Sequence, residues 1–150
     1  MQLSYQGINA IKEHEGFRDK AYKDSAGVWT IGYGTIKING KPVEEGMTCT
    51  QEQATQWLYA DLTWAQTAVN QMVRVALAQN QYDALVSFVY NEGETQFSKS
   101  TLLRKLNAQD YIGAGKEFDK WVYAGGKVVP GLVARRRIER DEFEGHSSNS

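Results

Sequence analysis

The spacing of apolar residues changes along this chain of 150 residues, and the change limits the folds open to it. Between residues 21 and 43 the apolar positions follow a two-residue period, which is typical of a half-buried strand. The alternating positions are Trp29, Ile31 and Tyr33 on one side, and Thr30, Gly32 and Gly34 on the other. Beyond Cys49 the apolar residues recur every three or four positions, as on one face of a helix. The sequence therefore predicts an α+β fold that is mostly helical, with a small antiparallel sheet.

Local signals predict where the first elements begin and end. Turn residues at 24–27 and 39–40 bracket the strand, so we expect two or three antiparallel strands. Ser4 is a candidate N-cap for a first helix that ends near His14, with Gly16 just beyond it.

The remainder of the chain is predicted to be helical. Thr50 and Gln53 have the spacing of a capping box, which starts a long helix. A second helix is expected to carry Tyr82, Leu85, Val86 and Val89 and to stop near residues 91–93. Shorter helices are expected over about residues 101–107, 111–122 and 132–143.

We expect residues 1–150 to form a single catalytic domain with two lobes, since an apolar content of 41% is ordinary for a globular protein. A sheet lobe is expected over about residues 15–50 and a helical lobe over about 51–145, joined by the long helix. The polar tail, residues 146–150, is expected to be disordered.

Composition argues against several classes of function. A formal net charge of −1 produces no field that would attract nucleic acid. The basic run near the C-terminus is Arg135, Arg136, Arg137 and Arg140, interleaved with Glu139, Asp141, Glu142 and Glu144. These acids cancel much of its field, so we expect no nucleic-acid partner. No clustered His or Cys pattern indicates a metal site, and no glycine-rich loop indicates a cofactor, so we expect neither.

Cysteine usage and the N-terminal residues predict where the protein is made. Cys49 is the single cysteine, so no internal disulfide can form, and we expect it to be a small, half-buried apolar residue. Residues 1–7 lack the apolar run of a signal peptide, and no segment approaches the roughly 20 apolar residues that cross a bilayer. We therefore expect cytoplasmic synthesis and no stable membrane insertion.

Two acidic residues could divide the work of cleaving a glycosidic bond, which needs a proton donor and help for an incoming water. Ile8, Ile11 and Glu15 are spaced three and four apart, so they share one helix face. Glu15 is the better candidate for a protonated acid, although this spacing equally allows it to turn toward solvent. Asp24 lies in a polar turn and should stay ionised. Two acids nine positions apart occur in many proteins, so the spacing alone establishes no site.

Three segments around these acids resemble the active-site region of phage-type lysozymes, glycoside hydrolase family 24. They are Glu15–Arg18, Ala21–Ser25 and Trp29–Gly34. In that family eight residues separate the catalytic Glu from an Asp, and five separate the Asp from a Thr; Glu15, Asp24 and Thr30 match without insertion. Other segments are similar to the lambdoid endolysin branch, in the same order: 80–85, 91–93, 100–107, 130–133 and 135–137.

The resemblance implies a lysozyme-like fold and a muramidase that hydrolyses the β-1,4 bond between N-acetylmuramic acid and N-acetylglucosamine in peptidoglycan. It implies that Glu15 is the general acid, that Asp24 supports the attacking water or the developing oxocarbenium charge, and that Thr30 helps to hold that water. The family is best known for inversion at the anomeric carbon, which predicts roughly 6.5–9.5 Å between the two carboxyl groups.

The resemblance also implies substrate contacts. Ile36, Tyr90 and Asn91 match family positions that line the sugar cleft, although Tyr90 could instead be a core residue and Asn91 a helix C-cap. Arg135 or Arg136 is expected to reach the catalytic cleft, where a cation would stabilise the carboxylates.

One position departs from the family pattern. Many relatives carry a histidine after the Gly-x-Gly, where it pairs with an acidic residue, whereas this chain has Thr35. That ion pair cannot form here, which concerns local stability rather than catalysis. His14, beside Glu15, points to another helix face and is expected on the surface.

An enzyme of this type would be a monomeric endolysin that acts on peptidoglycan glycan strands and lyses the host cell. Made in the host bacterial cytoplasm, it would act in the periplasm after a holin permeabilises the membrane. Two alternatives are a lytic transglycosylase and a non-catalytic wall-binding module. The first needs only the acid, and the second needs no complete trio, so Asp24 and Thr30 argue against both.

Overall fold

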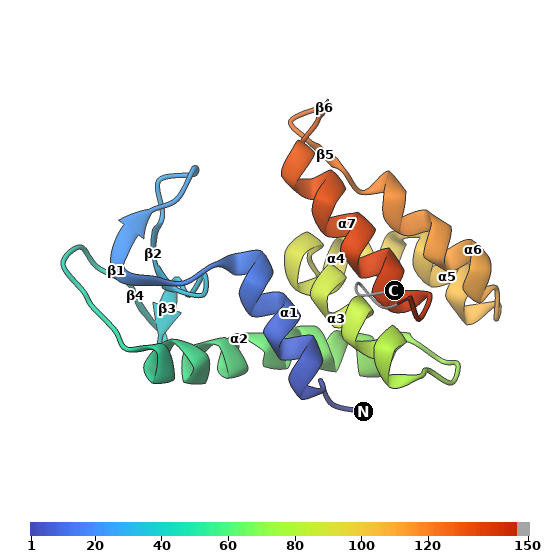
Figure 1. Cartoon of the computed structure of the whole chain (residues 1–150), viewed down its shortest axis with the longest axis horizontal. Coiled ribbons are helices and arrows are strands. Elements are labelled where there is room, and N and C mark those ends of the chain that lie inside the picture. The colour runs from blue at the N-terminus through green and yellow to red at the C-terminus, as the bar shows by residue number, and fades with distance from the viewer. Residues whose placement is uncertain (147–150) are drawn as a thin grey trace. The chain divides into compact units, whose positions relative to one another are not determined.

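The computed structural model describes residues 1–146, so the predicted tail lies outside the described part from residue 147 onward (Figure 1). The helices are α1 (Tyr5–Glu15), α2 (Gln51–Met72), α3 (Gln79–Glu92), α4 (Glu94–Lys99), α5 (Thr101–Asn107), α6 (Tyr111–Glu117) and α7 (Pro130–Phe143), with a 3₁₀ turn η1 (Phe118–Lys120). The strands are β1 (Arg18–Lys23), β2 (Trp29–Gly32), β3 (Lys37–Ile38), β4 (Lys41–Pro42), β5 (Tyr123–Ala124) and β6 (Lys127–Val128). The predicted α+β fold, mostly helical with a small antiparallel part, is confirmed, but the described strands form separate two-stranded sheets and not the one sheet of two or three strands that was expected.

The described strands form two-stranded antiparallel hairpins, β1–β2, β3–β4 and β5–β6. In the first hairpin Tyr22 pairs with Thr30. The alternation predicted for β2 is wrong in one respect, because Thr30 is only 4% exposed and Ile31 and Gly32 are buried as well. Both faces of β2 are covered, since a methyl group added at Gly32 would lie 2.9 Å from the Cβ atom of Ala54 on α2.

The predicted ends of the longer helices are confirmed. The Gly7 N–H donates to Ser4 Oγ at 3.0 Å, which is the N-cap bond of α1. In the capping box of α2, the Thr50 N–H donates to Gln53 Oε1 at 3.0 Å and the Gln53 N–H donates to Thr50 Oγ1 at 3.1 Å. α3 ends immediately before Gly93, as predicted.

The C-terminal half differs from the prediction in two places. The helix predicted over residues 111–122 ends at Glu117 and continues as η1, because the chain then turns into the β5–β6 hairpin. Neither that hairpin nor α4 was predicted, since both are too short to show a period in the sequence. α7 begins at Pro130, ahead of the predicted start at residue 132, because proline is favoured in the first helical position.

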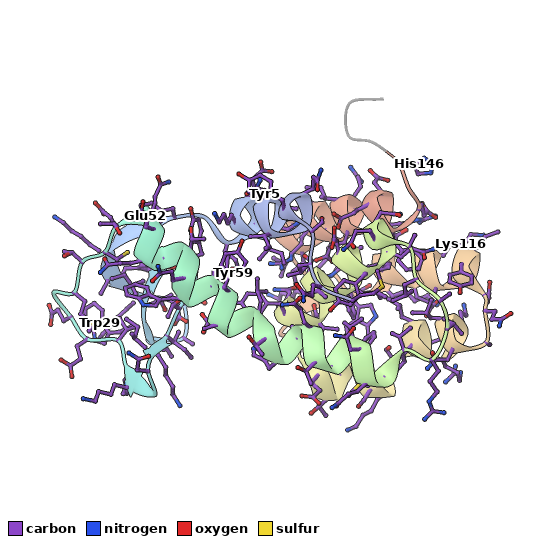
Figure 2. All side chains as sticks on the ribbon, turned by 90° about the horizontal axis from the view of Figure 1, so that it is seen from below. Tyr5, Trp29, Glu52, Tyr59, Lys116 and His146 are labelled. Carbon is purple, nitrogen blue, oxygen red and sulfur yellow. The ribbon has the colours of Figure 1, made fainter. Side chains whose placement is uncertain are left out.

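α2 is amphipathic along its 22 residues. Leu58 and Leu62 are fully buried. Glu52 and Tyr59 are exposed (Figure 2). Among residues 1–146, no helix has both the length and the apolar character that a membrane crossing requires.

The chain divides into two compact units. The sheet unit, residues 9–63, contains β1–β4, most of α1 and the first half of α2. Among the described residues, the helical unit comprises residues 1–8 and 64–146. α1 and α2 each belong to both units, so the predicted long helix between a sheet part and a helical part is confirmed. Fully buried residues include Ile11, Ile31, Leu58 and Leu62 in the sheet unit, and Leu85, Phe88, Phe97 and Phe118 in the helical unit.

Candidate active site

Glu15 is the last residue of α1 and is half-buried. Ile11, one turn earlier on the same face, is fully buried, so the apolar stripe of the helix leads up to the carboxyl group. The helix ends here, where the Gly16 N–H donates to the Lys12 carbonyl at 2.9 Å. A methyl group added at Gly34 would lie 3.5 Å from Glu15 Oε2. The backbone after β2 therefore lies directly beside the carboxyl group of Glu15.

Asp24 follows β1 in a tight turn and is half-buried. Its Oδ1 atom accepts hydrogen bonds from the Ala26 and Val28 N–H groups, both at 2.9 Å. An aspartate that accepts from backbone two and four residues later holds the turn and its own carboxylate in one orientation. Among residues 1–146, Oδ2 takes no hydrogen bond and is left for an outside donor.

Thr30 lies in β2 and donates from Oγ1 to the Val28 carbonyl at 2.9 Å. The N–H of Val28 bonds Asp24 and its carbonyl bonds Thr30, so one peptide segment holds both side chains. The hydroxyl proton of Thr30 is committed to this bond, which leaves its oxygen as an acceptor. The structure thus brings Asp24 and Thr30 together and places Glu15 beside the turn that follows β2. The distance between the two carboxyl groups stays a prediction.

Aromatic rings surround this end of α1. The rings of Phe17 and Tyr33 lie 5.4 Å apart, inclined by 49°, and Tyr33 is only 6% exposed. Lys12 Nζ lies 5.4 Å from the centre of the Tyr33 ring, within range of a cation–π contact. The aromatic rings of Phe17 and Tyr33 therefore follow Glu15 in the sequence, and the ammonium group of Lys12, on the same helix, contacts one of them.

Thr35, at the position where many relatives have histidine, is fully buried and donates from Oγ1 to Asp61 Oδ2 at 2.9 Å. Burial raises the pKa of the Asp61 carboxyl, and the hydrogen bond from Thr35 lowers it in part. The turn between Ile31 and Thr35 is closed by two backbone hydrogen bonds of 2.9 Å between these residues. It requires a φ of 92° at Gly34, a conformation that residues with a side chain rarely adopt. The ion pair missing from this position is replaced by a single hydrogen bond to Asp61. Asp61 was not among the residues that the sequence singled out. The signal that could have found it is an acidic residue on α2 between the buried residues Leu58 and Leu62.

The predicted substrate residues are divided between the two units. Ile36 belongs to the sheet unit and is 45% exposed. Tyr90 and Asn91 stand at the end of α3 in the helical unit; Tyr90 is half-buried, and its ring lies 6.0 Å from that of Trp64. The cap residue of α3 is Gly93, so the alternative interpretation of Asn91 as the C-cap is wrong.

Arg135 and Arg136 on α7 are buried, with 7% and 0% of their surface exposed. Arg135 Nε donates to Glu139 Oε2 at 3.1 Å, and its Nη2 donates to the Ser87 carbonyl at 3.2 Å. Arg136 donates to the Trp121 carbonyl at 2.9 Å, to Glu92 Oε1 at 2.8 Å, to Glu139 and to Asn91. These bonds tie α7 to α3. The predicted contact of either arginine with the catalytic cleft stays a prediction.

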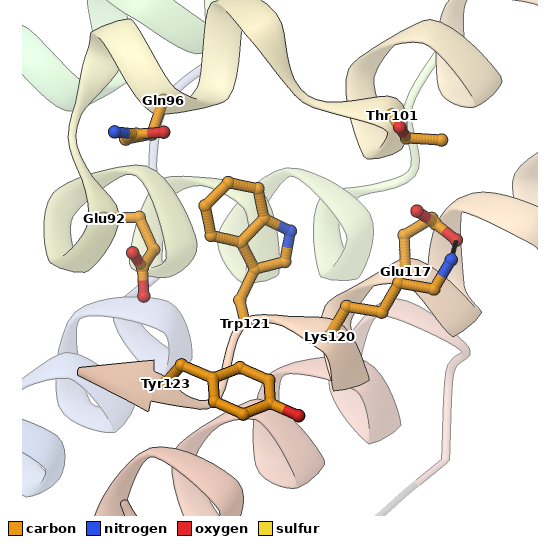
Figure 3. Close-up of a pocket in the computed structure, with 7 residues that line it drawn as sticks. All are labelled: Glu92, Gln96, Thr101, Glu117, Lys120, Trp121 and Tyr123. Carbon is orange, nitrogen blue, oxygen red and sulfur yellow. Dashed lines mark ion pairs between the residues drawn. The ribbon is translucent and has the colours of Figure 1, made fainter. Parts of the chain in front are cut away.

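The helical unit also contains a pocket of about 580 Å³ that sequence reasoning did not anticipate (Figure 3). Its lining residues are Glu92, Gln96, Thr101, Glu117, Lys120, Trp121 and Tyr123. Glu117 is only 4% exposed and forms ion pairs with Lys105 at 3.1 Å and Lys120 at 2.6 Å, so its pKa is lowered. Two aromatic rings beside amide and hydroxyl groups can contact a sugar ring or a peptide. Within residues 1–146, no group of three or more His, Cys, Asp or Glu residues is placed to hold a metal ion.

Comparison with known proteins places the chain among phage enzymes. Residues 12–139 match the family described as "Phage lysozyme". The endolysin of Salmonella phage P22 is 47% identical, over 95% of this chain and 98% of that protein. The solved endolysin of Escherichia coli O157:H7 phage FAHEc1 is 46% identical with a TM-score of 0.92, covering 95% of this chain and 93% of its own. The muramidase domain of SpmX from Asticaccaulis excentricus is 36% identical with a TM-score of 0.85, covering 95% and 97%.

Proposed function

The chain belongs to the phage lysozyme family, and we therefore propose that it is an endolysin that hydrolyses the β-1,4 bond between N-acetylmuramic acid and N-acetylglucosamine in peptidoglycan. The observation that carries the proposal is the family match over residues 12–139, which contains Glu15, Asp24 and Thr30 at the family spacing. The name of the related muramidase domain supports the same bond as the target.

In the proposed reaction Glu15 gives its proton to the glycosidic oxygen as that oxygen leaves the anomeric carbon. A water attacks the anomeric carbon from the opposite face, and its proton passes to Asp24. The hydrogen bonds from the Ala26 and Val28 N–H groups both go to Asp24 Oδ1, which supports a role for Oδ2 as the atom that accepts the proton of the water. Thr30 Oγ1 accepts a hydrogen bond from the same water. Inversion and a carboxyl separation of roughly 6.5–9.5 Å are part of this proposal.

We assign substrate contacts to Ile36, Tyr90, Asn91 and Arg135. Exposure of Ile36 supports a contact with the apolar face of a sugar. Asn91 is held by Arg136, which supports an amide kept in one orientation for sugar hydroxyls. Arg135 is proposed to supply positive charge near the carboxylates. No metal or cofactor takes part in the proposed reaction.

The proposed setting is lysis of a bacterial host from within. The enzyme would be made in the host cytoplasm and would act as a monomer on glycan strands in the periplasm. Release would depend on a holin that permeabilises the membrane.

The direct test of the assigned acid is Glu15→Gln, which keeps the shape of the side chain but removes its proton. We expect the rate at which purified peptidoglycan is cleared to fall by about 10²- to 10⁴-fold, the usual contribution of general acid catalysis. Glu13→Gln, at an exposed position on the same helix, is the matched control and should clear peptidoglycan at the wild-type rate. Wild-type clearing by Glu15→Gln would refute the role of Glu15.

A further inference from the structure

Asp83 is a buried carboxylate on α3 that contacts the first turn of α1, and it has no place in the reaction above. It is only 3% exposed. The Ser4 N–H donates to Asp83 Oδ1 at 3.1 Å, and Ser4 Oγ donates to Asp83 Oδ2. Gln79 Nε2 donates to Oδ1 at 2.8 Å. Asp83 therefore accepts two hydrogen bonds from Ser4, the N-cap residue of α1.

The Ser4 hydroxyl has a second task, because it also accepts the N-cap bond from the Gly7 N–H. The N-cap serine of α5 offers a comparison. Ser100 accepts from the Leu103 N–H at 3.0 Å, but its own proton goes to the carbonyl of Phe97, which is close in sequence. The Ser4 hydroxyl instead donates its hydrogen bond to Asp83 on a different helix. The residue that caps α1 therefore also attaches α1 to α3.

Gly7 provides a second, independent observation. A methyl group added at Gly7 would lie 2.6 Å from Asp83 Cγ and 2.9 Å from Asp83 Cβ. Such distances are too short for any side chain, so the first turn of α1 rests directly on Asp83. We call Ser4, Gly7 and Asp83 the helix clamp.

The helix clamp lies at one end of α1, and Glu15 is the residue at the other end. α3, which carries Asp83, also carries Tyr90 and Asn91, so the clamp joins the helix of the acid to the helix of two proposed sugar contacts. We propose that Asp83 is a positioning residue for glycan cleavage, which acts by fixing the start of the helix that presents Glu15. This inference rests on the proposed function.

The size of the effect follows from the geometry of a helix. α1 has 11 residues, so at about 1.5 Å per residue a small tilt of the first turn moves Glu15 by a larger distance. A displacement of about 1 Å in a reacting group can cost about 10²-fold in rate. Loosening the helix clamp should therefore lower kcat rather than raise KM.

The test compares two serine caps that differ in their partner. Ser4→Ala and Ser100→Ala each remove an N-cap bond of 3.0 Å, so both should lower Tm, and Ser4→Ala should lower it more because it also removes a donor to the buried carboxyl group of Asp83. With soluble peptidoglycan fragments, at a temperature where circular dichroism shows every variant folded, Ser4→Ala should lower kcat by about 10-fold or more with KM nearly unchanged. Ser100→Ala should keep the wild-type kcat. Ser4→Thr, which retains the hydroxyl, should also keep it.

Gly7→Ala tests the same contact without removing a hydrogen-bonding group, and it should reproduce the loss of kcat. If that variant does not fold, Gln79→Ala is a milder change, because it removes one bond to Asp83 and leaves those of Ser4. The proposal is overturned if Ser4→Ala and the second variant keep the wild-type kcat, or if Ser100→Ala lowers kcat as much as Ser4→Ala. A wild-type protein without turnover in the same assay would overturn the proposed function instead.

Discussion

The main chain of Val28 joins two of the proposed catalytic residues, since its N–H bonds Asp24 and its carbonyl accepts from Thr30. The spacing of Glu15, Asp24 and Thr30 is readable in the sequence because side chains carry the family pattern. A backbone group has the same chemistry in every residue, so no residue type at position 28 could indicate this link. The sequence was enough to propose the three residues, but it did not indicate how Asp24 and Thr30 are held.

At Thr35, too, the sequence indicates the residue that matters but not the contact that it makes. Its departure from the family pattern is visible in the sequence, and so is the loss of an ion pair. The partner that replaces the ion pair is Asp61, 26 residues away on α2. Contacts over such a distance depend on packing, which the local spacing of residues does not encode.

Thr35→Val keeps the shape of the side chain but removes the donor to Asp61. We expect the free energy of unfolding to fall by about 0.5–1.5 kcal/mol, the typical net contribution of one hydrogen bond, because Asp61 is only half-buried and water can reach its carboxyl group. Urea unfolding at neutral pH, followed by circular dichroism, measures the change. Thr63→Val, at an exposed position on α2, is the control and should change the free energy by less than about 0.5 kcal/mol. A Thr35→Val protein as stable as the wild type would show that the bond to Asp61 contributes nothing.

At the scale of elements, the long helices were predictable because their apolar residues recur at helical spacing over several turns. α2 and α3 have apolar residues over several turns, and α2 has a capping box at its start. β5, β6 and α4 are too short to repeat anything. The alternation in β2 misled for a different reason, since the packing of Gly32 against Ala54 covers its second face.

α7 carries a half-buried acid, Glu142, whose ionisation is linked to folding. Burial, with smaller contributions from the negative charges of Asp83 and Glu139, raises the pKa of the Glu142 carboxyl from 4.5 to about 8. The folded protein therefore binds this proton more strongly than the unfolded chain does. The stabilisation is complete at low pH, declines as the pH rises above the unfolded pKa, and is lost once the pH passes the folded pKa.

Glu142→Gln removes this titration. We expect a plot of Tm against pH between about pH 5 and pH 8 to be flatter for Glu142→Gln than for the wild type. Asp141→Asn changes an exposed acid in the same turn of α7 and should leave the slope unchanged. Equal slopes for the wild type and Glu142→Gln would mean that Glu142 is ionised in both states across this range.

At the scale of the whole molecule, each of the two units contains part of what the proposed function needs. Glu15, Asp24 and Thr30 lie in the sheet unit, whereas Tyr90, Asn91 and Arg135 lie in the helical unit. The family and the fold were predictable because the resemblance runs along nearly the whole chain in order. The helix clamp was not predictable, because Ser4 and Asp83 are 79 residues apart and the family resemblance of residues 80–85 does not indicate what the Asp83 side chain contacts.

Digestion of purified peptidoglycan in water enriched with oxygen-18, followed by mass spectrometry of the fragments, examines the proposed reaction itself. Hydrolysis adds one oxygen atom from water to the anomeric carbon, so we predict reducing N-acetylmuramic acid ends that carry the heavy isotope. Glu15→Gln should release almost none of these fragments. Unlabelled anhydro ends from the wild type, or labelled ends at an unchanged rate from Glu15→Gln, would contradict hydrolysis with Glu15 as the acid.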